Sequence, residues 1–440
     1  MFYPKVLIIG QTFNDFSGGG ITLSSLFKDW PKENLANLSY PFMIHNSTTK
    51  ICDNYYQIGK DEIRWRFPFY LFKQKFESGR VSIGTRQKIS VIKENRSIRQ
   101  FISSNILTPL MRWTGLVHFV SSINLSGPLK AFLCDFSPQI FYLQISNFES
   151  IRFSLDLLEH LQIPTVLHMM DDWPSTISGS GLFKKYWRRV IDREFRVLLG
   201  KTDLLLSISD AMSEEYLTRY GRRFIPFHNS IELEQFNIPR RGGTNKNNRI
   251  RILYVGRIGT ANRSSLLRFA KIISEYNFQG FDVELNIYTK DYNSSDTKKI
   301  RKLSKVEIFK PIEHADIPAL LVSYDILLLP LDFTDTGRKF SKLSMPTKAI
   351  EYMASGTPIL VFAPPETAIS RFCERNECAH CIIYPDPQEN ISSLVYLFTN
   401  HEYRSNLALN AKRISRQLFD SVIVRQEFRS TLSSLLNRQK

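Results

Sequence analysis

Short apolar runs of strand length alternate with helical stretches along most of the 440 residues. Turn-forming residues bound the runs, whereas the stretches between them carry apolar residues at helical spacing. Strands are predicted at 5–10, 139–146, 164–170, 203–209, 251–256, 281–289, 325–331 and 358–363, and helices at 265–276, 317–323 and 347–354. Because such alternation is typical of parallel strands covered by helices, we predict an α/β protein with doubly wound, Rossmann-like sheets.

A polar run, NIPRRGGTNKNN, interrupts this alternation at 237–248 and has too few apolar residues to pack a core. The chain length also favours two domains. We therefore predict an N-terminal domain over 1–236, a linker over 237–248 and a second domain over 249–409. A C-terminal helix within 410–440 is expected to pack back on the first domain. Ligands are expected in a cleft between the two sheets, at the carboxyl ends of their strands.

The formal net charge of +16 is concentrated in one segment. Between Arg64 and Arg99, ten lysines and arginines face two acids, a net charge of +8. Aromatic and aliphatic residues interleave with these charges and continue in ISSNILTPLMRWTGLVHFV, a pattern that favours an anionic membrane surface as partner. The alternative is a solvated basic face over a core helix. Nucleic acid is not expected, since no nucleic-acid-binding motif accompanies the charge.

The sequence has no apolar run long enough to span a bilayer. Five cysteines, an odd number, do not form a disulfide framework and suit a reducing compartment. We therefore expect a cytoplasmic protein, peripheral at the inner face of the cell membrane. The run CERNECAHC crowds four zinc-ligand types into nine residues, whereas structural zinc sites draw ligand pairs from separate segments, so no metal is expected.

Two segments carry candidate anion-binding residues. Glycines 18 to 20 lie between the first strand and a helix, where backbone amides can face a phosphate, so Gly19 and Gly20 are candidates; a structural tight turn is the alternative. Arg257 directly follows a strand in YVGRIGTANR, with Arg263 further on, and a guanidinium there can hold a diphosphate through two hydrogen bonds. A surface arginine is the alternative.

The segment KFSKLSMPTKAIEYMASGTPIL, from Lys339 to Leu360, is the most informative. It places Lys342 and Lys348 near a helix N-terminus, where cations are unfavourable unless an anion lies between them. Glu351, one turn inside the helix, can accept hydrogen bonds from ribose hydroxyls. A structural ion pair is the alternative for each residue.

These residues resemble the GT-B glycosyltransferases, specifically the retaining glycosyltransferase family 4. The resemblance covers nearly the whole chain. It is most specific in PTKAIEYMASGTPIL, similar to the family helix that carries the second glutamate of an E-x7-E motif, and it extends to VGR, YDILLLPL and LSISDAMSEEYLTRYG. It implies that the domain over 1–236 binds the acceptor and the domain over 249–409 binds the nucleotide sugar. It also implies that Glu351 binds the donor ribose and that Arg257, with a second basic residue, holds the donor diphosphate.

The chain departs from the family at two positions. The first motif glutamate falls at Leu343, and the family lysine after the arginine falls at Asn262, for which Arg263 or Lys348 can substitute. In the first domain, PTVLHMMDDWP resembles the family strand that brings a histidine or aspartate to the transferred sugar. His168, Asp171 and Asp172 are candidates, with His168 and Asp172 taken as catalytic; a satisfied core histidine is the alternative.

Together these features predict an enzyme that transfers a sugar from a nucleotide-sugar donor to a saccharide or lipid-linked acceptor, with retention and without metal or cofactor. Cell-surface polysaccharide or lipopolysaccharide synthesis is the expected setting. Because Leu343 replaces a family glutamate, a non-catalytic GT-B binding or scaffold protein is the alternative. A nicotinamide-dependent enzyme is less favoured, since the glycine loop lacks GxGxxG spacing.

Overall fold

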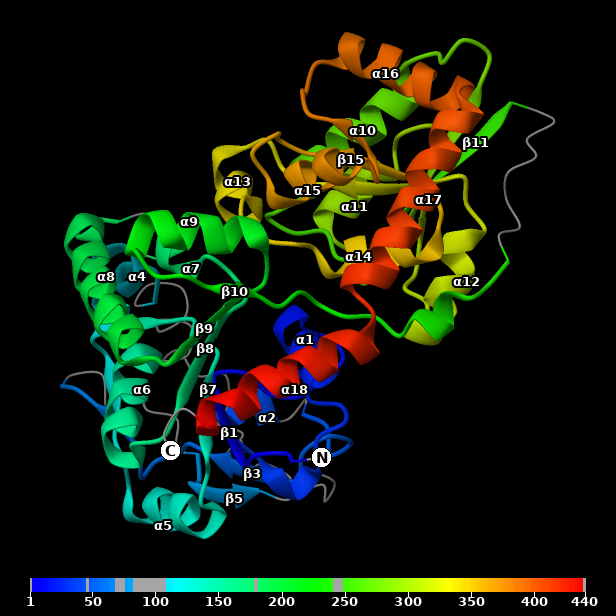
Figure 1. Ribbon diagram of the computed structural model, residues 1–440. Coiled ribbons are helices and arrows are strands. Elements are labelled where there is room, and N and C mark those ends of the chain that lie inside the picture. Colours follow the sequence, from blue (N-terminus) through cyan, green and yellow to red (C-terminus); the bar gives the residue numbers. More distant parts are fainter. Residues whose placement is uncertain are drawn as a thin grey trace. The chain divides into compact units, whose positions relative to one another are not determined.

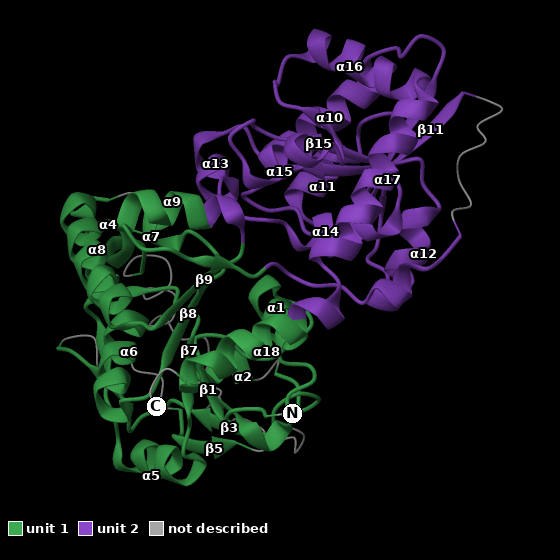
Figure 2. Ribbon diagram, in the orientation of Figure 1, with its two compact units in different colours: residues 1–208, 213–227, 425–440 green, residues 209–212, 228–424 purple. Residues whose placement is uncertain are grey.

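A computed structural model describes residues 2–44, 47–67, 76–81, 108–177, 181–239 and 248–437. The chain forms two compact units (Figure 2). Unit 1 comprises residues 1–208, 213–227 and 425–440, and unit 2 comprises 209–212 and 228–424. The chain therefore passes from unit 1 to unit 2 near residue 228 and returns at residue 425. Of the predicted linker, residues 240–247 lie outside the described residues.

Unit 1 is built on an eight-stranded sheet of order β10-β9-β8-β7-β1-β2-β3-β5 (Figure 1). Its strands are β1 (Val6–Ile9), β2 (Leu35–Ser39), β3 (Asn54–Gln57), β5 (Gly79–Val81), β7 (Ile140–Leu143), β8 (Thr165–Met169), β9 (Leu204–Ser207) and β10 (Ile225–Pro226). All neighbouring pairs are parallel except β3 and β5. A separate antiparallel pair joins β4 (Ile63–Trp65) to β6 (Ser121–Ile123).

The helices of unit 1 connect and cover this sheet (Figure 1). They are α1 (Gly18–Leu26), η1 (Lys32–Asn34), α2 (Pro41–Ile44), α4 (Thr108–Thr114), η4 (Leu116–His118), α5 (Gly127–Phe136), α6 (Phe148–Leu161), α7 (Trp173–Thr176), α8 (Lys184–Lys201) and α9 (Asp210–Tyr220), whose first residues are assigned to unit 2. Every residue of β1, β2, β7 and β8 is buried, as expected for parallel strands covered on both faces.

Unit 2 contains a six-stranded, fully parallel sheet of order β13-β12-β11-β14-β15-β16. Its strands are β11 (Arg249–Val255), β12 (Asp282–Tyr288), β13 (Val306–Phe309), β14 (Ile326–Pro330), β15 (Ile359–Phe362) and β16 (His380–Ile382). This is the 3-2-1-4-5-6 order of a doubly wound sheet, and β3-β2-β1-β7-β8-β9 repeats it in unit 1. The predicted doubly wound α/β class is therefore confirmed in both units.

The helices of unit 2 fall on both faces of its sheet. They are η5 (Leu233–Phe236), α10 (Arg263–Glu275), α11 (Ser295–Ile300), η6 (His314–Asp316), α12 (Ile317–Val322), α13 (Asp335–Ser341), α14 (Thr347–Ser355), α15 (Ala368–Asn376), α16 (Pro387–Thr399) and α17 (His401–Leu418). Two apolar clusters result. One, containing α14 and α17, covers one face of the sheet, and the other, containing α10 and α16, covers the opposite face.

The C-terminal helical stretch is broken at Phe419 and Asp420 into α17 and α18 (Ser421–Asn437). From Arg425 onward α18 belongs to unit 1 (Figure 2). Its anchor is Phe428, fully buried, whose ring contacts Phe27 and Phe227 with centroid separations of 5.1 and 5.5 Å. Arg425 adds an ion pair to Asp29 at 2.7 Å. Among the described residues, none of the helices combines the length and apolar character that a bilayer span requires.

Candidate functional site

The turn after β11 is shaped by Gly256. Its φ of +145° lies in a region that side-chain-bearing residues rarely adopt. A Cβ at this position would lie 2.3 Å from the Nζ of Lys348 and 3.1 Å from its Cε. The glycine therefore sets the backbone of the VGR turn and leaves the space that the lysine of α14 occupies.

The hydroxyl of Tyr254, on β11, joins three parts of this turn. Lys348 Nζ donates to it at 3.0 Å and lies 4.3 Å from the ring centroid, and Asn262 Nδ2 donates to it at 2.7 Å. The hydroxyl in turn donates to the carbonyl oxygen of Arg257 at 2.6 Å. Asn262 also donates to that carbonyl at 3.1 Å and accepts from the Gly259 amide at 2.9 Å. Lys348, Asn262 and the Arg257 backbone thus converge on one buried oxygen.

The ammonium of Lys348 is held in a low-dielectric setting. Burial lowers its pKa to about 8, and the nearby charge of Glu351 opposes that shift without cancelling it. Lys348 also lies in the first turn of α14, where the helix dipole disfavours a cation and where no side chain caps the helix. Its hydrogen bond to Tyr254 is to a neutral oxygen. An anion beside this lysine would be stabilised strongly, since little water screens the charge.

Glu351 lies one turn after Lys348 on α14. Its Oε1 is 3.5 Å from Nε2 of His314, which is itself largely exposed. The next residue, Tyr352, ties α14 to the strand end, because its hydroxyl accepts from the Val255 amide at 3.1 Å. Glu351 therefore lies on the same face of α14 as Lys348, near the end of β11.

The remaining predicted cations of unit 2 are placed differently. Arg257 is exposed at the VGR turn, and its guanidinium makes no hydrogen bond or ion pair with another described residue. Arg263 begins α10 and pairs with Asp296 at 3.6 Å. Lys342 is an exposed residue at the end of α13, and its carbonyl accepts from the Ala368 amide at 2.8 Å. Two residues were expected to substitute for the family lysine at position 262. Lys348 contacts the Tyr254 hydroxyl that Asn262 also contacts, whereas Arg263 pairs with Asp296.

Leu343, at the position of the first family glutamate, is only 3% exposed. Its carbonyl accepts from the Ser209 hydroxyl at 2.6 Å. The position is thus part of the packed interior of unit 2, where an ionised carboxylate would require compensating partners.

Unit 1 has a pocket of about 270 Å³ at the carboxyl ends of β1, β7 and β8. Its lining is mixed polar and aromatic: Gly10, Gln11, Gly19, Tyr40, Phe42, Met43, Gln144, Ile145, Ser146, Asn147, Ser150, His168, Met170, Asp171 and Trp173. Asn147 and Ser150 form a capping box at the start of α6. Amide and hydroxyl groups of this kind suit a polyhydroxylated ligand.

The predicted glycine and histidine residues of unit 1 meet around this pocket. Gly19 lines it, whereas the Gly20 amide donates to the hydroxyl of the cap residue Ser17 at 3.2 Å. A Cβ on Gly20 would lie 2.2 Å from Asn14 Nδ2, so close packing requires glycine there. His168 is fully buried on β8, and its Nδ1 is 2.6 Å from the Tyr142 hydroxyl.

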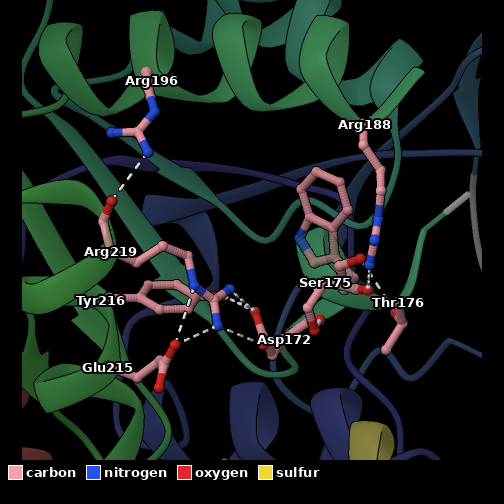
Figure 3. Close-up of polar contacts among 9 residues, drawn as sticks. Asp172, Ser175, Thr176, Arg188, Arg196, Glu215, Tyr216 and Arg219 are labelled. Atoms are coloured by element: carbon pink, nitrogen blue, oxygen red, sulfur yellow. Dashed lines mark hydrogen bonds and ion pairs between the residues drawn. The ribbon is translucent and has the colours of Figure 1, made fainter. Parts of the chain in front are cut away.

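Asp172 belongs to a different set of contacts (Figure 3). Both of its carboxylate oxygens accept from the Arg219 guanidinium, at 2.8 and 3.1 Å, and Tyr216 donates to Oδ1 at 2.9 Å. The Asp172 side chain is 9% exposed. This bidentate pair favours a structural role that joins α7 to α9, and Asp171 rather than Asp172 lines the pocket with His168.

The cysteine-rich run forms part of a packed helix end. Cys373 and Cys378 are buried, and the Cys378 amide donates to the Cys373 carbonyl at 3.2 Å. Glu377 adopts the left-handed conformation, so the two cysteines supply the apolar contact that accompanies such a helix terminus. Within the described ranges no group of three or more His, Cys, Asp or Glu side chains is arranged to hold a metal ion.

Several of these residues were not singled out from the sequence. No motif spacing in the sequence marks four of them, which are Tyr254, His314, Gln11 and Gln144. Three of them do share a signal, since Tyr254 lies near the end of a strand, Gln144 directly follows one and Gln11 comes two residues after one. Polar residues at the carboxyl ends of parallel strands are candidates for ligand contact.

Comparisons with known proteins bear on the fold and on the family match of the second unit. Residues 249–400 match the family model described as glycosyl transferases group 1. No curated protein matches the chain. Among solved structures, Anabaena HepE in complex with UDP and glucose matches with a TM-score of 0.61 and 14% identity, over 98% of this chain and 100% of the other.

Two further structures share the fold over nearly the whole chain. Sucrose-phosphate synthase from Thermosynechococcus elongatus gives a TM-score of 0.61 at 12% identity, over 98% of this chain and 99% of the other. WaaG, a glycosyltransferase involved in lipopolysaccharide biosynthesis, gives 0.56 at 12% identity, over 97% and 99%. These likenesses establish the GT-B fold. The chain therefore has the GT-B fold, and residues 249–400, within its second unit, match the glycosyl transferases group 1.

Proposed function

We propose that the protein transfers a sugar from a nucleotide-sugar donor to a saccharide or lipid-linked acceptor, with retention of anomeric configuration. The observation that carries this proposal is the convergence of Lys348, Asn262 and the Arg257 backbone on the Tyr254 hydroxyl. It holds a desolvated ammonium close to the backbone of Arg257, a residue that is itself exposed, at the end of β11. Two such cations suit a diphosphate and neutralise the charge that develops as it departs.

In this proposal Lys348 and Arg257 hold the donor diphosphate, and Glu351 accepts hydrogen bonds from the donor ribose. Lys348 takes the part of the family lysine that Asn262 replaces. The bond between the anomeric carbon and the phosphate oxygen breaks while the acceptor oxygen bonds to the same face of that carbon. The departing phosphate oxygen accepts the acceptor proton, so that no metal or protein nucleophile is required.

The pocket of unit 1 supplies the acceptor or sugar contacts, with His168 and Asp171 at its wall. Because His168 is wholly buried and hydrogen-bonded to Tyr142, it acts by orienting groups in the pocket. UDP, glucose and lipopolysaccharide biosynthesis appear in the names of the structures with the same fold, which supports a uridine or related nucleotide sugar and a cell-surface glycan. A cytoplasmic location is part of the same proposal.

Turnover of nucleotide sugars tests the proposed transfer reaction. The full chain is incubated with UDP-, GDP- and ADP-sugars, released nucleoside diphosphate is measured, and the anomeric configuration of any product is read by NMR. We expect transfer with retention, and a loss of about 100-fold or more in Arg257→Ala and Glu351→Gln. Nucleotide-sugar binding without turnover would instead favour the non-catalytic alternative, which the buried Leu343 supports. Unchanged turnover in both variants would refute the site.

A further inference from the structure

Two segments of unit 1, residues 108–119 and 181–189, form one surface. The Leu182 amide donates to the Trp113 carbonyl at 2.8 Å, and His118 and Trp187 have ring centroids 5.1 Å apart. A Cβ on Gly115 would lie 2.2 Å from the Trp187 ring, so the two segments are in direct contact. Trp187 is buried beneath them and anchors α8 to α4 and η4.

This 108–119/181–189 surface is unusually apolar for one that faces solvent. It carries eight large hydrophobic residues that are each between 42% and 60% exposed, among them Trp113, Leu116, Leu182 and Phe183. Scattered exposed apolar residues are ordinary on proteins, but a contiguous group of this kind marks an interaction surface. Aromatic residues with aliphatic neighbours are the side chains that enter the interfacial region of a bilayer.

The same surface is strongly basic. Its two segments contain five lysines and arginines and no acid: Arg112, Lys184, Lys185, Arg188 and Arg189. All five residues are exposed. Arg66 lies over the exposed Phe119 ring at 3.7 Å and extends the positive charge. Such density of like charge opposes pairing with a second copy of the chain, because the two surfaces would repel each other.

We infer that the 108–119/181–189 surface docks on an anionic lipid bilayer, with Trp113, Leu182 and Phe183 inserting between headgroups while the cations contact lipid phosphates. An anionic bilayer is the partner that satisfies both properties, because it offers an apolar interior beneath a layer of negative charge. The inference goes beyond the proposed transfer reaction. Apart from Arg66, it rests on residues outside the segment from Arg64 to Arg99, most of which lies outside the described residues.

The experiment is vesicle co-flotation of the full chain with phosphatidylcholine alone and with phosphatidylcholine mixed with phosphatidylglycerol. Binding is expected to the mixed vesicles and to weaken with added salt, as charge attraction requires. The variant Trp113→Ser, Leu182→Ser, Phe183→Ser is expected to bind about tenfold more weakly or worse. Lys184→Glu with Lys185→Glu is expected to lose on the order of tenfold affinity for the mixed vesicles.

A matched control replaces exposed apolar residues of unit 2, Tyr396→Ser and Leu409→Ser, and should float like the parent chain. A second readout uses brominated phosphatidylcholine within the mixed vesicles. It should quench part of the tryptophan emission of the parent chain, and Trp113→Phe should lose that part while still binding. UDP affinity measured without lipid should be unchanged in every variant, so failure here is distinguishable from failure of the proposed function.

Three results would overturn the inference. The parent chain could fail to float with the mixed vesicles, or the control variant could lose as much binding as the surface variant. Sedimentation could also show that the parent chain is a dimer and that the surface variant is a monomer, in which case the surface is an interface between copies.

Discussion

Two clusters of charged residues, one in each unit, contrast in how their charges are satisfied. In unit 1, Asp172 and Arg219 form a bidentate ion pair that Tyr216 completes, so opposite charges neutralise each other inside the protein. In unit 2, Lys348 donates to the neutral hydroxyl of Tyr254, and its pKa falls to about 8 because burial outweighs the field of Glu351.

We propose that the contrast separates a charge that stabilises the fold from one that is held ready for a ligand. A paired carboxylate has its hydrogen-bonding capacity satisfied and gains little from a substrate. A desolvated ammonium held by neutral groups raises the free energy of the empty protein and is stabilised when an anion arrives. Each of the following predictions tests one side of that distinction.

The largest effect is expected from Asp172→Asn. It removes the more buried of the two carboxylates that pair with Arg219 and leaves only Glu215, and should lower the free energy of unfolding by about 3 kcal/mol. Chemical denaturation measures this, and the UDP dissociation constant should stay within error. The control is Asp192→Asn, whose partner Arg196 is largely exposed, with an expected loss of about 0.5 kcal/mol. A large loss of UDP affinity in Asp172→Asn would give this residue a role at the ligand.

Next in size is the response to Lys348→Met. Losing one desolvated cation should weaken UDP or GDP binding by about 100-fold. The free energy of unfolding of the empty protein should rise by about 1–2 kcal/mol, since a desolvated charge is removed. Isothermal titration and denaturation give both numbers for the same sample. Weaker binding together with lower stability would indicate a structural lysine instead.

The pH dependence should follow from the lowered pKa of Lys348. As pH rises through about 8, the ammonium loses its proton in the empty protein, so UDP affinity should fall, by about tenfold between pH 7 and pH 9. The folded state binds fewer protons than the unfolded chain between the two pKa values. The Lys348 contribution therefore makes the empty protein more stable as pH rises from about 8 toward about 10.4. Lys348→Met should flatten both trends.

The smallest effect is expected from Tyr254→Phe. It removes the oxygen shared by Lys348, Asn262 and the Arg257 carbonyl, and should cost about 1 kcal/mol of stability and weaken UDP binding about threefold to tenfold. Tyr55→Phe, which deletes another buried tyrosine hydrogen bond, to the Thr48 carbonyl in unit 1, is the matched control. It should lose similar stability and no UDP affinity.

Much of the fold was accessible from the sequence, because parallel strands buried on both faces read as unbroken apolar runs such as VLII and ILLLP. The helix from Thr347 was also predicted, since Pro346 and Gly356 mark its ends. The break at Phe419 was not, because neither proline nor glycine marks it. Short strands such as β5 and β16 carry too few residues to show a pattern.

The site was predicted less completely than the fold. Arg257, Lys348 and Glu351 follow from their places after a strand and in a helix start. Both Lys348 and Arg263 are basic, so the sequence alone does not say which of them replaces the family lysine. Their tertiary contacts differ, because Arg263 pairs with Asp296 whereas Lys348 donates to the Tyr254 hydroxyl. The engagement of Asp172 by Arg219 joins residues 47 positions apart, which no local pattern reveals.

The central claim is that Lys348 provides the cation that the chain lacks at Asn262. Moving the lysine from position 348 to position 262 tests this claim directly. UDP and GDP binding is measured for the parent, Lys348→Met, Asn262→Lys and the double variant Lys348→Met with Asn262→Lys. Both side chains reach the Tyr254 hydroxyl, so we expect the double variant to recover about tenfold of the affinity that Lys348→Met loses. If Lys348→Met binds as the parent does, or if the double variant is no better than Lys348→Met while remaining folded, the claim is contradicted.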